Sequence, residues 1–113
     1  MEKMPNLQRN RNALHEDKSI SAVNLWRIIN RAYLSMQINE GTEFYNESDC
    51  DSTYDKNVIL ADEALITTPT TWMGVHNFIT MLLDDFMSDD AERLLVGIKT
   101  LSTALQRLAP IKA

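Results

Sequence analysis

Between residues 21 and 38 the apolar side chains recur at steps of three and four. Such a stripe lies along one face of a helix and turns toward a protein core. The pattern therefore predicts an amphipathic helix over about 21–38, with Ser19 or Ser21 as its N-cap and an end near Gly41. The stripe consists of Val23, Trp26, Ile29, Tyr33 and Met36, and the polar residues mostly on the other side are Asn24, Arg27, Asn30 and Arg31.

Residues 39–54 break this period and concentrate acidic side chains without any Lys or Arg. We interpret them as a loop that Phe44 and Tyr45 fix to the core. This loop is longer than the about 2–8 residues that usually connect helices in bundles, so folding alone does not explain it. The next helix is predicted over about 55–66, with Asp55 as its N-cap. The acids of the loop are Glu40, Glu43, Glu47, Asp49 and Asp51.

Pro69 is predicted to end the second helix. Proline lacks a backbone N–H group and disfavours helical geometry at the residue before it. Thr71, or alternatively Thr70, is then expected to cap a third helix with its hydroxyl group. Gly74 falls in the first turn of that helix, where the missing side chain would let another backbone approach.

The apolar side chains after this turn again follow helical spacing. Asp84 and Asp85 oppose the helix dipole near the far end, so the helix should not run far beyond Met87. Trp72, like Trp26, is interpreted as a core residue. The stripe consists of Trp72, Val75, Ile79, Leu82 and Phe86.

A fourth helix is predicted to begin after Ser88, its N-cap, and to end before Pro110. Its apolar residues alternate steps of four and three, as in a packed helix seam. Gly97 interrupts the seam and indicates a close helix contact. Such a seam serves the core of a monomer or the interface of a homodimer equally well. The seam residues are Leu94, Ile98, Leu101, Leu105 and Leu108.

Four helices with short connections, apart from one acidic loop, predict an all-α fold, namely a small antiparallel four-helix bundle. Three glycines and three prolines are few for an all-β fold, which needs both residues for its turns. Residues 1–18 are polar and show no apolar period. We interpret them as a flexible polar arm that precedes a single helical domain over 19–113.

The net charge of −5 and the isoelectric point near 4.9 disfavour two classes of partner. Nucleic acids and anionic membranes are bound through Lys and Arg, and here the acids outnumber these bases 16 to 11. The single cysteine, Cys50, has no partner for an internal disulfide. No segment has the pattern of a signal peptide or a membrane-spanning helix. We therefore expect a cytoplasmic protein.

No set of residues assembles an enzyme site, and we expect no cofactor and no metal. His76 approaches Asp84 along a helix, but no nucleophile accompanies the pair. Cys50 lies among acidic residues, which is an unfavourable setting for a nucleophilic thiol. The alternating acids around Cys50 resemble a calcium loop in part, yet they lack the glycine and the glutamate that an EF-hand requires.

We therefore expect a non-enzymatic protein of unknown pathway that binds a basic protein partner through its acidic loop. The contact residues would be Glu40, Glu43, Glu47, Asp49 and Asp51. The alternative is a small DNA-binding regulator, which would use the bases of the arm and the last two helices as a helix-turn-helix.

Overall fold

The computed structural model describes residues 16–109, and all the regular secondary structure in this range is helical. The predicted all-α class is therefore confirmed. Most of the predicted arm, residues 1–15, lies outside the described residues. The elements are α2 (Lys18–Ile38), α3 (Glu47–Ile66), α4 (Trp72–Leu82), the short α5 (Asp85–Ser88) and α6 (Ala91–Leu108).

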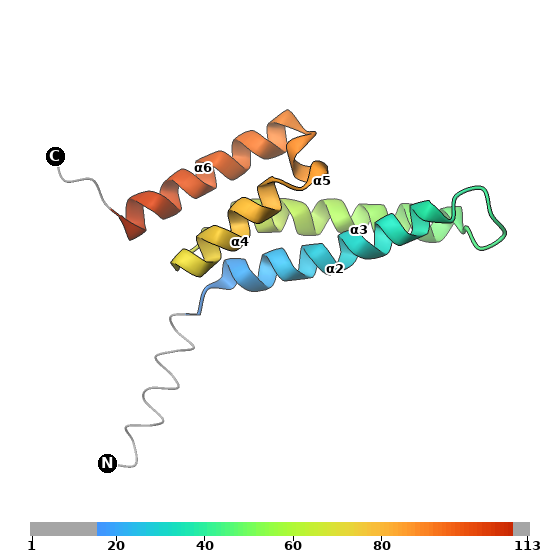
Figure 1. The fold of residues 1–113 in the computed structure, drawn as a ribbon, viewed down its shortest axis with the longest axis horizontal. Helices are drawn as coiled ribbons and strands as arrows, with labels where there is room; N and C mark the ends of the chain where they lie inside the picture. The colour runs from blue at the N-terminus through green and yellow to red at the C-terminus, as the bar shows by residue number, and fades with distance from the viewer. Residues whose placement is uncertain (1–15, 110–113) are drawn as a thin grey trace, which may run out of the picture.

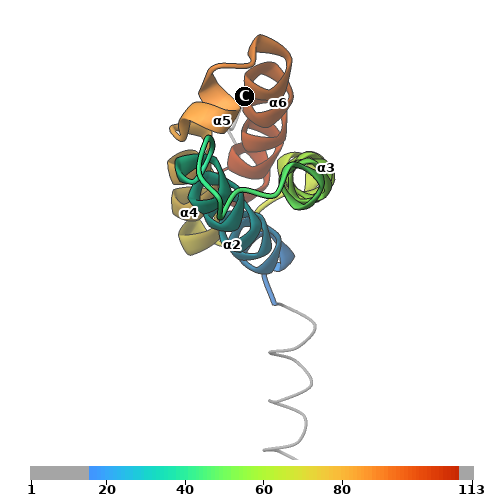
Figure 2. The ribbon, with the colours of Figure 1, turned by 90° about the vertical axis from the view of Figure 1, so that its right-hand side faces the viewer.

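Helices α2 and α3 run antiparallel as a long hairpin, and the other helices pack on one half of it (Figure 1). Helix α4 contacts α2, α6 contacts both α3 and α4, and α5 contacts α4 and α6. Figure 2 views the molecule from the turn of the hairpin, with α5 and α6 above α2 and α4 beside it. The end of the hairpin that carries the α2–α3 connection therefore projects beyond α4, α5 and α6.

Helix α2 begins earlier than predicted, because Asp17 rather than Ser19 or Ser21 is its N-cap. Oδ1 of Asp17 accepts hydrogen bonds from the backbone N–H and the hydroxyl of Ser19, at 3.0 and 2.6 Å. A carboxylate at this position also complements the positive end of the helix dipole. Asp17 and Lys18 thus belong to the folded domain rather than to the arm. The helix ends at Ile38, as predicted.

Helix α3 begins at Glu47, so the predictions of a loop over 39–54 and of a helix capped by Asp55 are wrong. The connection between α2 and α3 consists only of residues 39–46. This length lies within the usual range of about 2–8 residues for helix connections. Excess loop length, which suggested a functional role, is therefore not a feature of this protein.

The early start of α3 has a local cause and a packing cause. The side chain of Asn46 caps the helix by accepting a hydrogen bond from the backbone N–H of Asp49 at 3.0 Å. Acidic side chains in the first turn, Glu47 and Asp49, suit the positive end of the helix dipole. One helix turn later Cys50 is buried, and Asn57 is buried on the same face two turns further on. The buried face thus extends through the acidic segment.

The turn between α3 and α4 has the predicted form. Helix α3 ends at Ile66, before Pro69, and Thr71 is the N-cap of α4. Oγ1 of Thr71 accepts a hydrogen bond from the backbone N–H of Gly74 at 3.0 Å. A proline that stops one helix and a threonine that starts the next are both local signals, and here both predictions are confirmed.

Two aspartates start the last two helices. Asp84 caps α5, and Asp90 caps α6 by accepting hydrogen bonds from two backbone N–H groups of the first turn. Ser88, the predicted cap of the last helix, is instead the final residue of α5. Aspartate caps a helix as well as serine does, so residue type alone does not show whether Ser88, Asp89 or Asp90 caps α6.

The side of α6 that faces the core agrees only in part with the predicted seam, of which Leu94 and Leu101 pack against the core. Gly97 and Ala104 are buried, and Leu101 packs partly buried against the core. Ile98 and Leu105 are 50% and 38% exposed, so they do not belong to the core. The predicted close contact at Gly97 is confirmed, because a β-carbon at this position would overlap a leucine side chain of α4.

The hydrophobic core lies where α2, α3 and α4 meet, and it includes one methionine of α5. Trp26 is fully buried in it, as predicted, whereas Trp72 is 56% exposed and its prediction as a core residue is wrong. Trp72 is the first residue of α4 and lies outside the face that packs on α2 and α6. The core residues are Val23, Trp26, Ala61, Ala64, Leu65, Phe78, Met81, Leu82 and Met87.

Candidate functional site

The predicted partner-binding acids all lie at the end of the α2–α3 hairpin that carries the connection, which we call the hairpin end (residues 38–51). Each of them is exposed. The described residues contain a single ion pair, and it lies elsewhere, at the start of α6. The acids of the hairpin end therefore have no counter-ion within the described part of the chain. Glu40 and Glu43 lie in the connection, and Glu47, Asp49 and Asp51 lie in the first turns of α3.

Apolar side chains are exposed at the hairpin end as well. Ile38 is 81% exposed and Phe44 is 77% exposed, so Phe44 does not fix the connection to the core as predicted. Tyr45 is partly buried beside Cys50. Hydrogen bonding with Cys50, burial and nearby negative charges raise the pKa of Tyr45 to about 12. The phenol group of Tyr45 is thus neutral at physiological pH and adds no charge to the acidic surface.

A second candidate is a cavity of about 500 Å³ lined by residues of α2, α3, α5 and the start of α6. Its volume is in the range typical of small-molecule sites. Three aromatic rings lie side by side along its wall. The ring centroids of Tyr33 and Tyr54 are 5.3 Å apart, and those of Tyr54 and Phe86 are 6.3 Å apart. The acidic lining residues are Asp84, Asp85, Asp89 and Asp90.

A line of buried hydrogen bonds reaches this cavity from the core. Nε1–H of Trp26 donates to Oδ1 of Asn57 at 2.6 Å, and Nδ2–H of Asn57 donates to Oδ1 of Asn30 at 2.9 Å. An indole nitrogen can only donate, so Trp26 fixes the orientation of both amide groups. Asn30 lines the cavity and is only 5% exposed. Within residues 16–109, its Nδ2 group donates to no protein acceptor.

Arg93 occupies one side of the cavity. Its guanidinium carbon lies 4.3 Å from the centroid of the Phe86 ring, and Nη1 donates to the backbone carbonyl of Phe86 at 3.3 Å. The same nitrogen lies 3.5 Å from a carboxylate oxygen of Asp90. Arg93 therefore neutralises Asp90, while the remaining acids of the cavity are paired with no base in the described part of the chain.

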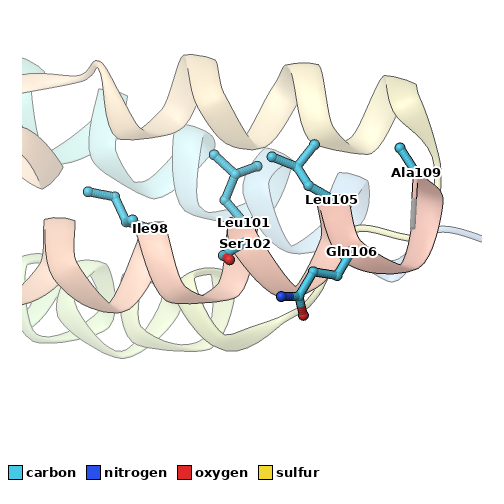
Figure 3. Close-up of a pocket in the computed structure, with 6 residues that line it drawn as sticks. All are labelled: Ile98, Leu101, Ser102, Leu105, Gln106 and Ala109. Carbon is cyan, nitrogen blue, oxygen red and sulfur yellow. The ribbon is translucent and has the colours of Figure 1, made fainter. Parts of the chain in front are cut away.

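An apolar groove of about 330 Å³ runs along α6. Figure 3 shows Leu101 and Leu105 pointing from α6 toward the neighbouring helix α4, whereas Ile98 extends along α6 and Gln106 points away from α4. None of the residues that line this groove is charged. The groove thus provides apolar surface and not the convergent polar groups that catalysis requires.

The other residues considered for chemistry do not come together. Within residues 16–109 no hydrogen bond or ion pair joins the side chains of His76 and Asp84, and Asp84 instead accepts from a backbone N–H as the cap of α5. Cys50 is buried and free. Across the described residues, no group of three or more metal-ligating side chains is close enough to hold a metal ion. Within residues 16–109, no helix combines the length and the apolar character needed to cross a membrane.

Sequence reasoning located the acids of the hairpin end but missed the cavity. Asn30 was assigned mostly to the polar side of its helix, yet it is buried. Its spacing contained the missed signal, because Asn30 follows Trp26 by one helix turn and therefore lies on the same face. The four aspartates of the cavity resembled ordinary helix-end residues, and three of them are caps of α5 or α6.

Comparison with known protein families, with curated proteins and with solved structures finds no match to this chain. The geometry itself provides the two candidates for function. The hairpin end combines uncompensated acids with exposed apolar side chains. The cavity combines aromatic rings, carboxylates and a buried amide donor.

Proposed function

We propose that the protein is a non-enzymatic interaction protein that binds a basic protein partner through the hairpin end. The observation that carries this proposal is the projection of the hairpin end beyond α4, α5 and α6 (Figure 1). A projecting end can enter a recess on a partner and contact it from more than one side. We propose no catalytic role, because the thiol of the hairpin end, Cys50, is buried whereas its acids are exposed.

The charge of the hairpin end favours a basic partner. The sequence contains no Lys or Arg between Arg31 and Lys56, so no basic side chain of this segment neutralises its acids. Repulsion among like charges is relieved when a partner supplies the opposite charge. This attraction accelerates association and weakens as salt rises, because exposed charges are screened over about 8–10 Å at physiological ionic strength.

The exposed apolar side chains supply the second component of an interface. Phe44 and Ile38 are the most exposed large apolar residues of the hairpin end. Aromatic side chains that become buried at the centre of an interface contribute much of the binding energy, while charges around them set specificity and rate. We therefore expect the partner to present an apolar recess bordered by Lys and Arg, with Phe44 as the anchor.

The test measures binding to a partner captured from cell lysate, identified and then purified. The first variant is Glu40→Gln/Glu43→Gln, because these acids lie outside the helix and do not stabilise the start of α3. The second variant is Phe44→Ser. The control is Asp62→Asn/Glu63→Gln, which makes the same change in net charge at exposed positions near the other end of α3.

We expect the glutamate variant to bind about tenfold more weakly at low salt, with a smaller difference at high salt. The Phe44→Ser variant should weaken binding at every salt concentration, and the control should bind like the wild type. Wild-type affinity in both hairpin-end variants would refute the proposal. Retardation of duplex DNA by the wild-type protein in a gel-shift assay would favour the alternative of a DNA-binding regulator.

A further inference from the structure

We infer that the cavity beside Asn30, Tyr54 and Phe86 is a binding site for an organic cation that also carries a hydrogen-bond acceptor. The inference does not depend on the proposed function, because it uses none of the acids or apolar anchors of the hairpin end. It rests on the buried amide of Asn30, on the aromatic walls and on the carboxylates without a basic partner.

The amide of Asn30 offers a hydrogen-bond donor to a ligand. Within residues 16–109 no fully buried side-chain nitrogen or oxygen lacks a partner, so the Nδ2 group of Asn30, which donates to no protein acceptor, is open to the cavity. Trp26, through Asn57, holds the amide in the orientation that leaves this group free. An amide Nδ2 group can only donate. A ligand carbonyl or hydroxyl oxygen placed in the cavity would complete this line of hydrogen bonds.

The aromatic rings and carboxylates that line the cavity favour a positively charged ligand. Aromatic faces attract ammonium and guanidinium groups, and Arg93 over the ring of Phe86 shows one such contact already formed by the chain itself. Arg93 is paired with Asp90, so the other carboxylates remain for a second cation. These carboxylates belong to Asp84, Asp85 and Asp89.

The size of the cavity suits a small ligand. A volume of about 500 Å³ is sufficient for a small molecule or for one side chain with its adjoining peptide group. A guanidinium or ammonium group on a short carbon chain, linked to a carbonyl, satisfies both requirements. Such a group occurs in free basic metabolites and in the Lys or Arg side chains of peptides.

The test uses N-acetyl-L-arginine amide as the probe and N-acetyl-L-citrulline amide as its neutral counterpart. The two molecules have almost the same shape, but citrulline carries a urea group in place of the guanidinium. Binding is followed by NMR in the full chain, through the side-chain amide signals of Asn30 and the ring signals of Tyr54 and Phe86. We expect saturable shifts with the arginine derivative and weaker binding, by about tenfold, of the citrulline derivative.

The matched variant is Asp84→Asn/Asp89→Asn. Asparagine caps a helix as well as aspartate, so this variant removes charge from the cavity and keeps the start of α5. We expect it to weaken binding of the arginine derivative by about tenfold. The control Asp62→Asn/Glu63→Gln, which makes an equal change of charge outside the cavity, should bind the probe normally.

Free L-arginine, compared with the capped derivative, identifies the source of the ligand. Tighter binding of the free amino acid would indicate a metabolite, and tighter binding of the derivative would indicate a side chain within a peptide; both results support a cation site. Absence of shifts at Asn30, equal affinity for the citrulline derivative, or unchanged affinity in the Asp84→Asn/Asp89→Asn variant would overturn the inference.

Discussion

The hydroxyl of Thr71 donates a hydrogen bond to Oδ2 of Asp17 at 2.7 Å, although the two residues are 54 positions apart in the chain. The backbone N–H groups of Thr70 and Thr71 donate to the same oxygen, at 3.1 and 3.0 Å. Oδ1 of Asp17 accepts two further bonds from Ser19. One buried carboxylate thus caps α2 and joins its start to the start of α4.

The first prediction concerns the loss of this carboxylate. Asp17→Ala removes a helix cap and leaves the N–H groups of Thr70 and Thr71 without their acceptor, so we expect a loss of about 2–4 kcal/mol in the free energy of unfolding. Urea denaturation measures this loss. Asp90→Ala is the control, because Asp90 caps α6 and its ion pair with Arg93 also lies within the start of α6, so it joins no second helix, and it should lose about 1 kcal/mol. Similar losses at the two positions would contradict a role of Asp17 beyond capping.

The second prediction is a pH dependence that originates at Asp17. Burial raises the pKa of this carboxyl group, but the hydrogen bonds from Ser19, Thr71 and Thr70 outweigh burial and hold its pKa below the ordinary value of 3.8. A lowered folded-state pKa means that the stabilisation is complete above pH 3.8 and is lost as the pH falls through the folded pKa.

Asp17→Asn isolates this contribution from the other acids of the chain. The free energy of unfolding of the wild type should exceed that of the variant at neutral pH, and the difference should shrink as the pH falls below 3.8. Urea denaturation of both proteins along a pH series measures the difference. A difference that stays constant across this range would show that the charge of Asp17 contributes nothing.

The third prediction compares two buried glycines. A β-carbon at Gly74 would overlap the carboxylate of Asp17, which five hydrogen bonds hold in place. A β-carbon at Gly97 would overlap the far ends of leucine side chains, which can shift. Gly74→Ala should therefore lose about 2 kcal/mol or more, whereas Gly97→Ala should stay within about 1 kcal/mol of the wild type, since alanine also favours the helix. Thermal unfolding ranks the two variants, and the reverse order would contradict this account.

These contacts also show which structural features a sequence reveals. Pro69 and Thr71 act on residues adjacent in the chain, so their roles as helix stop and helix cap were predictable. The role of Asp17 depends on Thr70 and Thr71, which lie far away in the sequence, and no local pattern indicates that they meet. The sequence predicts that the missing side chain of Gly74 lets another backbone approach, but the side chain of Asp17 occupies the place where a β-carbon of residue 74 would lie.

The two candidate sites also differ in how far the sequence reveals them. The acids of the hairpin end were identified from their density and from the absence of nearby bases, although their placement in a loop was only partly correct. The acids of α3 belong to a helix because Asn46 caps it and Cys50 begins its buried face, and a high density of charge indicates neither feature. The cavity brings together α2, α3 and α5, and its assembly follows from tertiary packing alone.

The fourth prediction tests which side of α6 faces the core. Leu101 packs against the core, so Leu101→Asp buries an unpaired charge and should lose at least about 3 kcal/mol or prevent folding. Ile98→Asp makes the same chemical change one turn earlier, at a half-exposed position in the groove, and should lose less than about 1 kcal/mol.

Circular dichroism during urea denaturation, at two protein concentrations, measures both variants. Equal losses in the two variants would contradict the structure and support the predicted seam, in which both residues face the core. A loss in Ile98→Asp that grows with protein concentration would show that a second copy of the chain covers the groove, because association stabilises the folded state by mass action. A small, concentration-independent loss at Ile98 beside a large loss at Leu101 is the result that the structure predicts, since of these two residues only Leu101 packs against the core.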